Sequence, residues 1–509
     1  MIPSRLNILS LAGWAALVWG LPFSHAAMSM GTAWLGVLAL WALCTSSKAR
    51  HNLTSASSWR PMLCLTALLG WSTLSMVWTS DVSWGWRVLG LQWPILVLML
   101  AWPALDMGEL DRSKVQGWVF GSAGLAMVVC LAWGGWHLSQ GEVLEGRGWS
   151  PWVSHVRLSL FAALGLGWAA TSRPLWQLAV FSIVWSAFVG ATGSLTSAVL
   201  LPMSWVWIGL KRIPNAWQPW YRGGALTLIG LAAMAAAWML QPTPLPDQPW
   251  PTTTSWGNPY QHRPERLASE NGHRLHMHVC RVEWDQAWDQ ISDVPLSTLS
   301  QAGFPLSARL WRYLTSKGWP KDGAHILQLT PAEVKRIESG ATSVVERRGF
   351  RARLAAFRWE WETWLEGGNP SGHSVFQRLE HWAAGWHAWN QAWWIGHGAG
   401  DAEMALQEGY EATGTRLASQ HRHRTHMQHL TWGVTGGLVG ILLWLAFLGS
   451  HMWAVRAVKG ALWGGLVVAL SCVFEDTLET QAGVMVAGLA WALVGGRQAN
   501  RPKAASATS

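Results

Sequence analysis

Apolar runs follow one another along almost the whole chain, and they constrain the fold more than any other feature. A helix needs about 20 mostly apolar residues to cross the hydrocarbon core of a bilayer. Only 13% of the 509 residues are charged, against about 25% in an average soluble domain. The sequence therefore predicts an all-α polytopic membrane protein with about twelve transmembrane helices. The expected spans are 6–21, 28–44, 62–78, 88–102, 117–136, 158–170, 175–189, 195–210, 225–240, 430–448, 453–474 and 484–494, with the exact number within 158–210 left open.

The distribution of Lys and Arg predicts how these helices are oriented, because short cytoplasmic loops are enriched in positive charge. With the N-terminus inside, the cytoplasmic side holds Lys48, Arg50, Arg60, Arg112, Lys114, Arg173, Lys211, Arg212, Arg222, Arg456, Lys459, Arg497, Arg501 and Lys503. The opposite short loops hold Asp81, Glu142, Glu145, Glu475, Asp476 and Glu479, with Arg147 and Arg157 as the main basic exceptions. We expect a multi-pass protein of the bacterial inner membrane with both termini in the cytoplasm.

The beginning of the chain has some features of a cleaved signal peptide, with Arg5 before an apolar stretch and Ala26 and Ala27 after it. A second apolar run follows almost at once, and the charge pattern fits with the first run retained. We favour a first transmembrane helix.

This topology divides the chain into four parts. Residues 1–240 form a bundle of about nine helices, 241–428 a large periplasmic loop, 429–497 three further helices, and 498–509 a cytoplasmic tail. The loop contains one cysteine, Cys280, and therefore cannot hold an internal disulfide.

Local patterns predict a mainly helical structure for the loop. Thr330, Pro331 and Glu333 form a helix start with an N-cap, a proline in the first turn and a capping box. The expected elements are a short strand at 276–282, helices at 348–365 and 375–393, a stop at 367–370, a tight glycine turn at 396–400 and a helical piece that extends to about residue 419.

Arginine and histidine side chains on the predicted outer face could carry chemistry. Arg157 stands at the mouth of the sixth span, Arg378 on a loop helix, and Arg424 and His426 just before the tenth span. Guanidinium groups pair with phosphate oxygens in a bidentate manner, and a histidine can accept a proton from a hydroxyl near neutral pH. Gly398 and Gly400 could let backbone N–H groups approach an anion.

Each of these features also has a simpler interpretation. Arg378 could be a solvated residue on a helix surface, Arg157 could be an interfacial anchor, and the basic run could contact lipid head groups. The histidines His421, His423, His426 and His429 could hold a metal ion, but the surrounding arginines repel a cation, and we expect no metal. The acidic residues Glu475, Asp476 and Glu479 could be a simple outer loop, or one of them could pair with an arginine of the site or orient an acceptor hydroxyl.

Several segments together resemble the O-antigen ligase family, including a Bacteroidetes-type branch of it. The segments that carry the resemblance are 154–160 (SHVRLSL), 313–318 (YLTSKG), 372–382 (GHSVFQRLEHW), 396–401 (GHGAGD), 424–430 (RTHMQHL) and 475–481 (EDTLETQ). The number of spans and the large late outer loop also fit this family.

The resemblance implies a membrane glycosyltransferase that moves a glycan from undecaprenyl pyrophosphate to an acceptor hydroxyl, either on lipid A–core (ligase) or on another repeat unit (polymerase). It implies that His426 acts as general base and that Arg157, Arg378 and Arg424 hold the pyrophosphate, with His155, Gly398, Gly400, Glu475 and Asp476 as supporting residues. No cofactor, metal or nucleic acid is implied, and the expected partners are the lipid-linked donor, the acceptor and membrane lipids. Met427 departs from the Asn that usually follows the family histidine.

Two other functions remain open at this point. A transporter of lipid-linked or anionic solutes would need charges deep within several spans and related halves, whereas these spans are nearly uncharged. A membrane-anchored binding module would present the Arg and His side chains to open solvent rather than to a pocket.

Overall fold

The computed structural model describes residues 5–55, 59–140, 142, 144, 146–299, 305–345, 349–371, 375–456 and 461–493. Several sequence predictions lie outside these residues. They are the charges of Glu145, Lys459, Arg497, Arg501 and Lys503, the motif residues 372–374 and the cytoplasmic tail 498–509.

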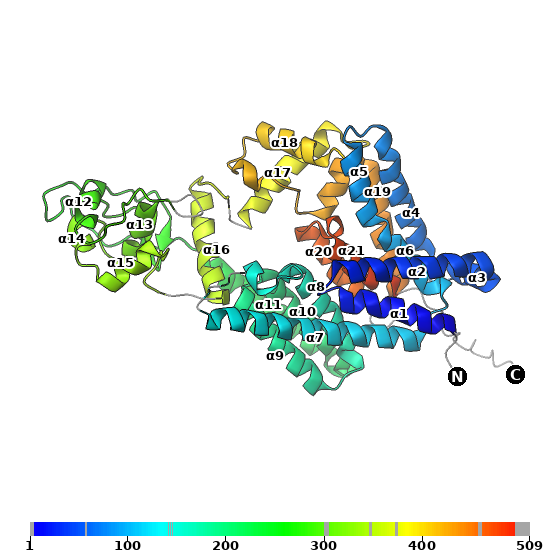
Figure 1. The fold of residues 1–509 in the computed structure, drawn as a ribbon. Coiled ribbons are helices and arrows are strands. Elements are labelled where there is room, and N and C mark those ends of the chain that lie inside the picture. Colours follow the sequence, from blue (N-terminus) through cyan, green and yellow to red (C-terminus); the bar gives the residue numbers. More distant parts are fainter. Residues whose placement is uncertain are drawn as a thin grey trace. The chain divides into compact units, whose positions relative to one another are not determined.

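The described chain is mainly helical, with almost no sheet (Figure 1). Its first half contains α1 (Arg5–Gly20), α2 (His25–Thr45), α3 (Ser47–Ser55), α4 (Trp59–Leu74), η1 (Ser75–Val77), α5 (Val82–Gln92), α6 (Pro94–Ala104), α7 (Glu109–Ser139), η2 (Gly146–Trp149), α8 (His155–Trp168), η3 (Ala169–Thr171), α9 (Leu175–Thr192), α10 (Leu195–Arg212), η4 (Asn215–Trp217) and α11 (Gln218–Met239). Its second half contains β1 (Ser269–Glu270), β2 (His273–Arg274), η5 (Arg281–Glu283), α12 (Trp284–Trp288), α13 (Leu306–Ser316), α14 (Gly323–Ile326), α15 (Pro331–Glu338), α16 (Gly349–Leu365), α17 (Phe376–Gln391), α18 (Ala402–Ala412), η6 (Ser419–His421), α19 (Gln428–Val455), α20 (Ala461–Phe474), η7 (Thr477–Glu479) and α21 (Gln481–Ala492).

The chain forms two compact units. Unit 1 comprises residues 1–226, 378–415 and 419–509, and unit 2 comprises residues 227–377 and 416–418. The sequence-based division placed all of 241–428 in one loop domain. In the structure, residues 378–415 and 419–428 cluster with the helices of unit 1.

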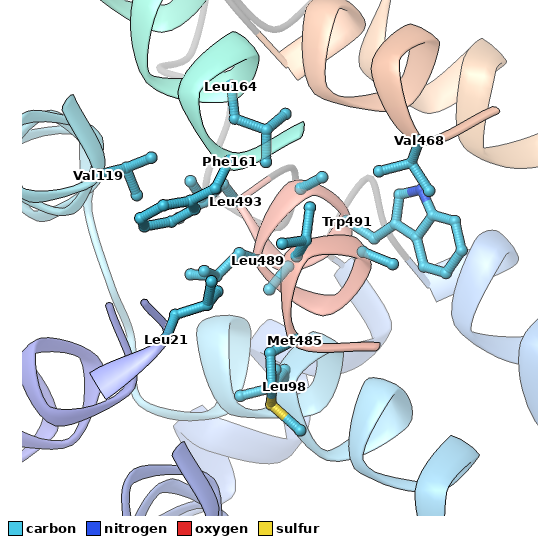
Figure 2. Packing of buried hydrophobic residues seen from close by; sticks show 14 of the residues in the cluster. Leu21, Leu98, Val119, Phe161, Leu164, Val468, Met485, Leu489, Trp491 and Leu493 are labelled. Atoms are coloured by element: carbon cyan, nitrogen blue, oxygen red, sulfur yellow. The ribbon is translucent and has the colours of Figure 1, made fainter. Parts of the chain in front are cut away.

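The core of unit 1 is built around α8 and α21. Every residue from Ala482 to Ala492 is buried, and so is every residue from Arg157 to Trp168. A helix that is apolar on all sides is buried either within a protein core or in a membrane. Figure 2 shows the cluster of apolar side chains in which Trp491 lies near Val468 and Met485 near Leu98. This buried centre holds the ends of α8 and α21, on which parts of the candidate site stand.

Five helices of the described chain are long and apolar enough to cross a membrane: His25–Thr45, Val82–Ala104 (α5 with α6), Glu109–Ser139, Leu175–Thr192 and Gln428–Val455. The helices α20 and α21 are apolar but shorter. The outward sides of α2 and α9 expose large apolar side chains such as Leu40, Trp41 and Ile183. These features are compatible with a multi-pass membrane protein.

One predicted span begins at the wrong place. The sequence suggested a break between 448 and 453, but α19 continues without a break there to Val455, and α20 begins at Ala461. The polar residues Ser450 and His451 do not end the helix. Ser450 bonds back to the carbonyl of Phe447 within the helix, and His451 is buried.

Helix α19 is kinked at Gly437, whose backbone has φ 63° and ψ −157°. A Cβ atom at this position would lie 2.4 Å from the carbonyl carbon of Trp394, so the close approach requires glycine. At the kink, the N–H groups of Leu438 and Val439 donate to the carbonyls of Trp393 and Trp394 at 2.8 and 3.4 Å. The carbonyl groups of Trp393 and Trp394, just after α17, thus take the place of the helix carbonyls that would accept from these N–H groups in an unbroken α19.

Unit 2 has its own apolar core, formed by α12 to α15 around Trp288, Leu310, Tyr313 and Ile337. The predicted start of α15 is confirmed. The Thr330 hydroxyl accepts from the N–H of Glu333, and the Glu333 side chain accepts from the N–H of Thr330.

The predicted strand at 276–282 is wrong. The only strands in the described chain are the two-residue β1 and β2, which pair in antiparallel fashion. Residues 276–278 form a turn and bends, with His278 at φ 55°, and Val279 makes only isolated bridges, to Gln261 and to Lys321. Met277, Val279 and Cys280 are buried there without pairing in a sheet, whereas Val282 is exposed.

Candidate functional site

Three basic side chains from distant parts of the sequence meet at one carboxylate in unit 1. Nη2 of Arg378 lies 2.5 Å from Oε1 of Glu475. Nη2 of Arg157 and Nδ1 of His426 each lie 3.9 Å from its other oxygen, Oε2. The sequence had marked all four residues, and the fold brings them together on α8, α17, the approach to α19 and the loop after α20.

Arg157 is held firmly in the first turn of α8 and is only 6% exposed. Its Nε donates to the Thr480 hydroxyl at 3.2 Å, and its Nη2 donates to the carbonyl of Asp476 at 3.3 Å. Its Nη1 is buried without a hydrogen-bond partner among the described residues. A buried guanidinium N–H without an acceptor is costly, and it is the kind of donor that an anionic ligand would satisfy.

Glu475 is strongly stabilised in its charged form. Burial alone would raise the pKa of its carboxyl group, but the contact with His426 and the charges of Arg157 and Arg378 outweigh burial and lower that pKa to about 2. The carboxylate therefore acts as an internal anion within a basic cluster.

His426 occupies a backbone conformation that few non-glycine residues adopt, with φ 51°. Its N–H donates to Oδ2 of Asp476 at 2.8 Å, while Oδ1 of Asp476 accepts from the hydroxyls of Thr425 and Thr431 at 3.1 and 2.8 Å. The side chain of Gln428 accepts from the N–H of Leu478 at 2.8 Å. These bonds join the His426 segment to the loop between α20 and α21.

Arg424 lies beside this cluster and does not contact Glu475. Its Nη1 donates to the carbonyl of Glu479 at 2.7 Å, and Oε1 of Glu479 accepts from the amide of Gln92 at 3.0 Å. Burial raises the pKa of the Glu479 carboxyl group, against the opposing effect of Arg424. Arg424 and Glu479 line a small cavity of about 40 Å³ together with residues of α5 and α18.

The glycine turn has a packing role. The N–H of Gly398 donates to the carbonyl of Thr435 at 3.0 Å, and that of Gly400 donates to the Thr79 hydroxyl at 3.4 Å. A Cβ on Gly398 would lie 2.2 Å from Oγ1 of Thr79. The expectation that these N–H groups approach an anion is therefore corrected, because protein atoms already accept from them.

His155 begins α8, and its Nδ1 is buried without a hydrogen-bond partner among the described residues. It is close enough to Glu475 and Arg147 for their charges to act on it. It thus lies at the edge of the cluster.

The histidines near His426 do not gather into a metal site. Nδ1 of His429 accepts from the Trp444 indole at 2.7 Å, within the helix packing. Across the described part of the chain, no group of three His, Cys, Asp or Glu residues is placed to hold a metal ion. Met427 caps α19 without a side-chain hydrogen bond, as expected for a residue that cannot replace Asn.

The sequence reasoning missed His381 and Tyr410. The His381 ring is buried with its centroid 5.0 Å from that of His426, and its Nδ1 lies 2.6 Å from the Tyr410 hydroxyl, which donates to the carbonyl of His423 at 2.8 Å. Burial, with the neighbouring charges of His426, His423 and Arg378, lowers the pKa of His381 to about 3. The spacing of three residues between Arg378 and His381 on one predicted helix was a signal that could have revealed this residue.

Comparison of the chain with protein-family models gives no match, and comparison with curated proteins gives none either.

Proposed function

We propose that this protein is a metal-independent glycosyltransferase of the inner membrane, with about twelve spans and a periplasmic active site. In this proposal it transfers a glycan from undecaprenyl pyrophosphate to an acceptor hydroxyl, as in ligation of O-antigen to lipid A–core. Polymerisation of repeat units by the same chemistry is the alternative within this class.

The convergence of Arg157, Arg378 and His426 on Glu475 is the observation that carries the proposal. Separate segments of the chain supply a fixed arginine, a second arginine and a histidine at one point. A pyrophosphate leaving group needs positive charge at the bond that breaks, and a hydroxyl nucleophile needs a nearby proton acceptor.

Arg157 is suited to bind one phosphoryl group of the donor. Two of its donors are fixed by Thr480 and Asp476, so the guanidinium plane is already oriented, and the buried Nη1 still lacks an acceptor among the described residues. Such preorganisation lets the positive charge act on the leaving group without rearrangement. Arg378 is more exposed than Arg157. It supplies the second positive charge when the pyrophosphate of the glycan donor competes with Glu475 for the Arg378 guanidinium.

His426 is suited to accept the proton of the acceptor hydroxyl. The acceptor oxygen attacks the anomeric carbon, the bond from that carbon to the pyrophosphate oxygen breaks, and the bonding electrons leave with undecaprenyl pyrophosphate. The proton passes to His426, and attack from the face opposite the leaving group inverts the anomeric centre. Glu475, 3.9 Å from Nδ1 of His426, stabilises the imidazolium that forms.

Transfer by the purified protein tests this proposal directly. Protein in detergent is offered an oligosaccharide on undecaprenyl pyrophosphate, with lipid A–core or a second lipid-linked repeat as acceptor and with a chelator present. We expect chelator-resistant transfer that falls at least a hundredfold in His426→Ala, since general-base catalysis typically contributes about 10²–10⁴. The productive acceptor distinguishes a ligase from a polymerase.

His429→Ala is the matched control, because His429 lies three residues away but bonds Trp444 instead of the cluster. It should transfer glycan at close to the wild-type rate. Equal transfer by His426→Ala and wild type would refute the base assignment. Absence of transfer to either acceptor by folded wild-type protein would favour a transporter or a binding module.

A further inference from the structure

A second basic cavity lies in unit 2, outside the site described above. It has a volume of about 110 Å³ and is lined by Gln261, Arg263, His276, Val279, Arg281 and Trp311. Two arginines line it, and no carboxylate does.

The backbone around this cavity is rigidly connected. Gln261 and Val279 exchange two N–H to carbonyl hydrogen bonds, at 2.7 and 3.1 Å, and the N–H of Arg263 donates to the carbonyl of His276 at 2.9 Å. The Trp311 indole on α13 donates to the carbonyl of Leu275 at 2.9 Å. The side chains that line the cavity therefore stand on segments that are fixed to one another.

Arg281 is preorganised by aromatic rings. Its guanidinium carbon lies 5.3 Å from the ring centroid of Trp284 and 5.5 Å from that of Trp311. These contacts restrict the planar group, while no described residue accepts a hydrogen bond from its N–H groups. An arginine held in this way loses little conformational entropy when it binds an oxyanion in a bidentate manner.

The charge around the cavity is positive. The side chain of Arg263 also has no hydrogen-bond acceptor among the described residues. The carboxylate of Glu366 lies 4.0 Å from Nε2 of His276 and is itself paired with Arg266 at 3.5 Å. The buried amine of Lys321 adds to the positive field at His276.

From this geometry we infer that the cavity between Arg263 and Arg281 binds a compact oxyanion, the carboxylate of an acidic sugar or the phosphate of a phosphorylated one. Two guanidinium groups with unused donors face one space that has room for such a group and little more. The choice of a saccharide as carrier rests on the proposed transferase function, whereas the binding of an oxyanion does not.

Calorimetric titration of the full-length protein in a neutral polyoxyethylene detergent tests this inference. The probes are galacturonate, glucose 1-phosphate, inorganic phosphate and uncharged galactose. All titrations use the Arg378→Ala background, which weakens anion binding at the Glu475 cluster and makes the result independent of transferase activity. We expect galacturonate or glucose 1-phosphate to bind and galactose not to bind.

Substitution of the two arginines should identify the site. Arg281→Gln and Arg263→Gln should each weaken binding about tenfold or more, because each substitution removes a charged hydrogen-bond donor to the oxyanion. Lys335→Gln, which removes a charge from the exposed side of α15, should leave the affinity unchanged. The thermal unfolding midpoint of each variant shows that it is folded.

Two results would overturn the inference. The first is that none of the three anions binds, and the second is that both arginine variants bind as well as their parent. If inorganic phosphate binds more tightly than glucose 1-phosphate and galacturonate, the cavity recognises a free anion, and the saccharide part of the inference is wrong.

Discussion

The N–H of His426 donates a 2.8 Å hydrogen bond to Oδ2 of Asp476, and this bond fixes the backbone of the histidine in a left-handed conformation. Such a conformation costs about 1–3 kcal/mol for a non-glycine residue and persists only where surrounding contacts impose it. Asp476 is 4% exposed and also holds Thr425 and Thr431. Asp476 is therefore a positioning residue for His426.

Asp476→Ala should reduce glycan transfer strongly and lower stability by at least about 1.5–3 kcal/mol, the contribution of a single hydrogen bond to a charged group, because three such bonds are lost. Asp401→Ala is the matched control, because Asp401 is also buried and its carboxylate accepts from two backbone N–H groups, those of Ser80 and Asp81. It should lower the thermal midpoint by a similar amount while transfer per folded molecule stays near wild type. Similar transfer rates in the two variants would contradict a positioning role for Asp476.

Glu475 gives the cluster a defined pH dependence. The folded-state pKa of about 2 lies below the ordinary value of its carboxyl group, so the charged form stabilises the folded protein. This contribution is fully present above about pH 5 and is lost as the pH falls toward 2. Glu475→Gln should lower the thermal midpoint at pH 7, and the difference from wild type should shrink steadily between pH 5 and pH 3. Glu411→Gln, on the exposed side of α18, should show no such trend.

Alanine substitutions at Gly398 and Gly414 can distinguish the cost of backbone strain from the cost of steric contact. Both have positive φ, 101° and 60°, but a Cβ on Gly398 would meet Thr79 at 2.2 Å, whereas one on Gly414 would meet nothing within 4 Å. Gly414→Ala should cost about 1–2 kcal/mol of stability. Gly398→Ala should cost about 2–5 kcal/mol, because overpacking adds to the same strain. Equal losses in denaturant or thermal unfolding would show that the turn is not closely packed against Thr79.

Lys321 predicts a second pH dependence, in unit 2 and at higher pH. Its amine is buried and donates to the carbonyls of Met277 and Arg274 at 2.6 and 3.2 Å, and burial lowers the pKa of Lys321 to about 7. Between about pH 7 and pH 10 the unfolded chain binds this proton and the folded unit does not, so the stability of unit 2 should rise with pH. Hydrogen exchange of α13, corrected for the intrinsic pH effect, measures this trend. Lys321→Met should abolish it, and Lys335→Met should not.

The helices were largely predictable because their determinants are local. Apolar periodicity and length located most helices of unit 1, and Thr330 with Glu333 located the start of α15 to the residue. The segment that leads to Val279 was misassigned because burial under loops and burial within a sheet select the same apolar residue types. Nothing in the local sequence distinguishes them.

The site was only partly predictable for a related reason. Arg157, Arg378, His426 and Glu475 stood out individually by charge and place, but their common meeting point depends on how α8, α17 and α20 pack. The position of His381 beside His426 and its contact with Tyr410 depend on how α17 and α18 pack together. The glycines drew attention as anion-binding candidates, whereas the space they leave is filled by Thr79 and Thr435.

The break in α19 at Gly437 limits how this protein can be dissected. Leu438 and Val439 take their backbone acceptors from Trp393 and Trp394, which lie outside that helix. Where lipid replaces water, an N–H group without an acceptor costs several kcal/mol. Residues 378–415 are therefore not a detachable appendage. Excision of these residues to obtain a simpler bundle would leave two backbone N–H groups of α19 without acceptors. The shortened protein should fail to insert, or the part of α19 after Gly437 should refold in a different register.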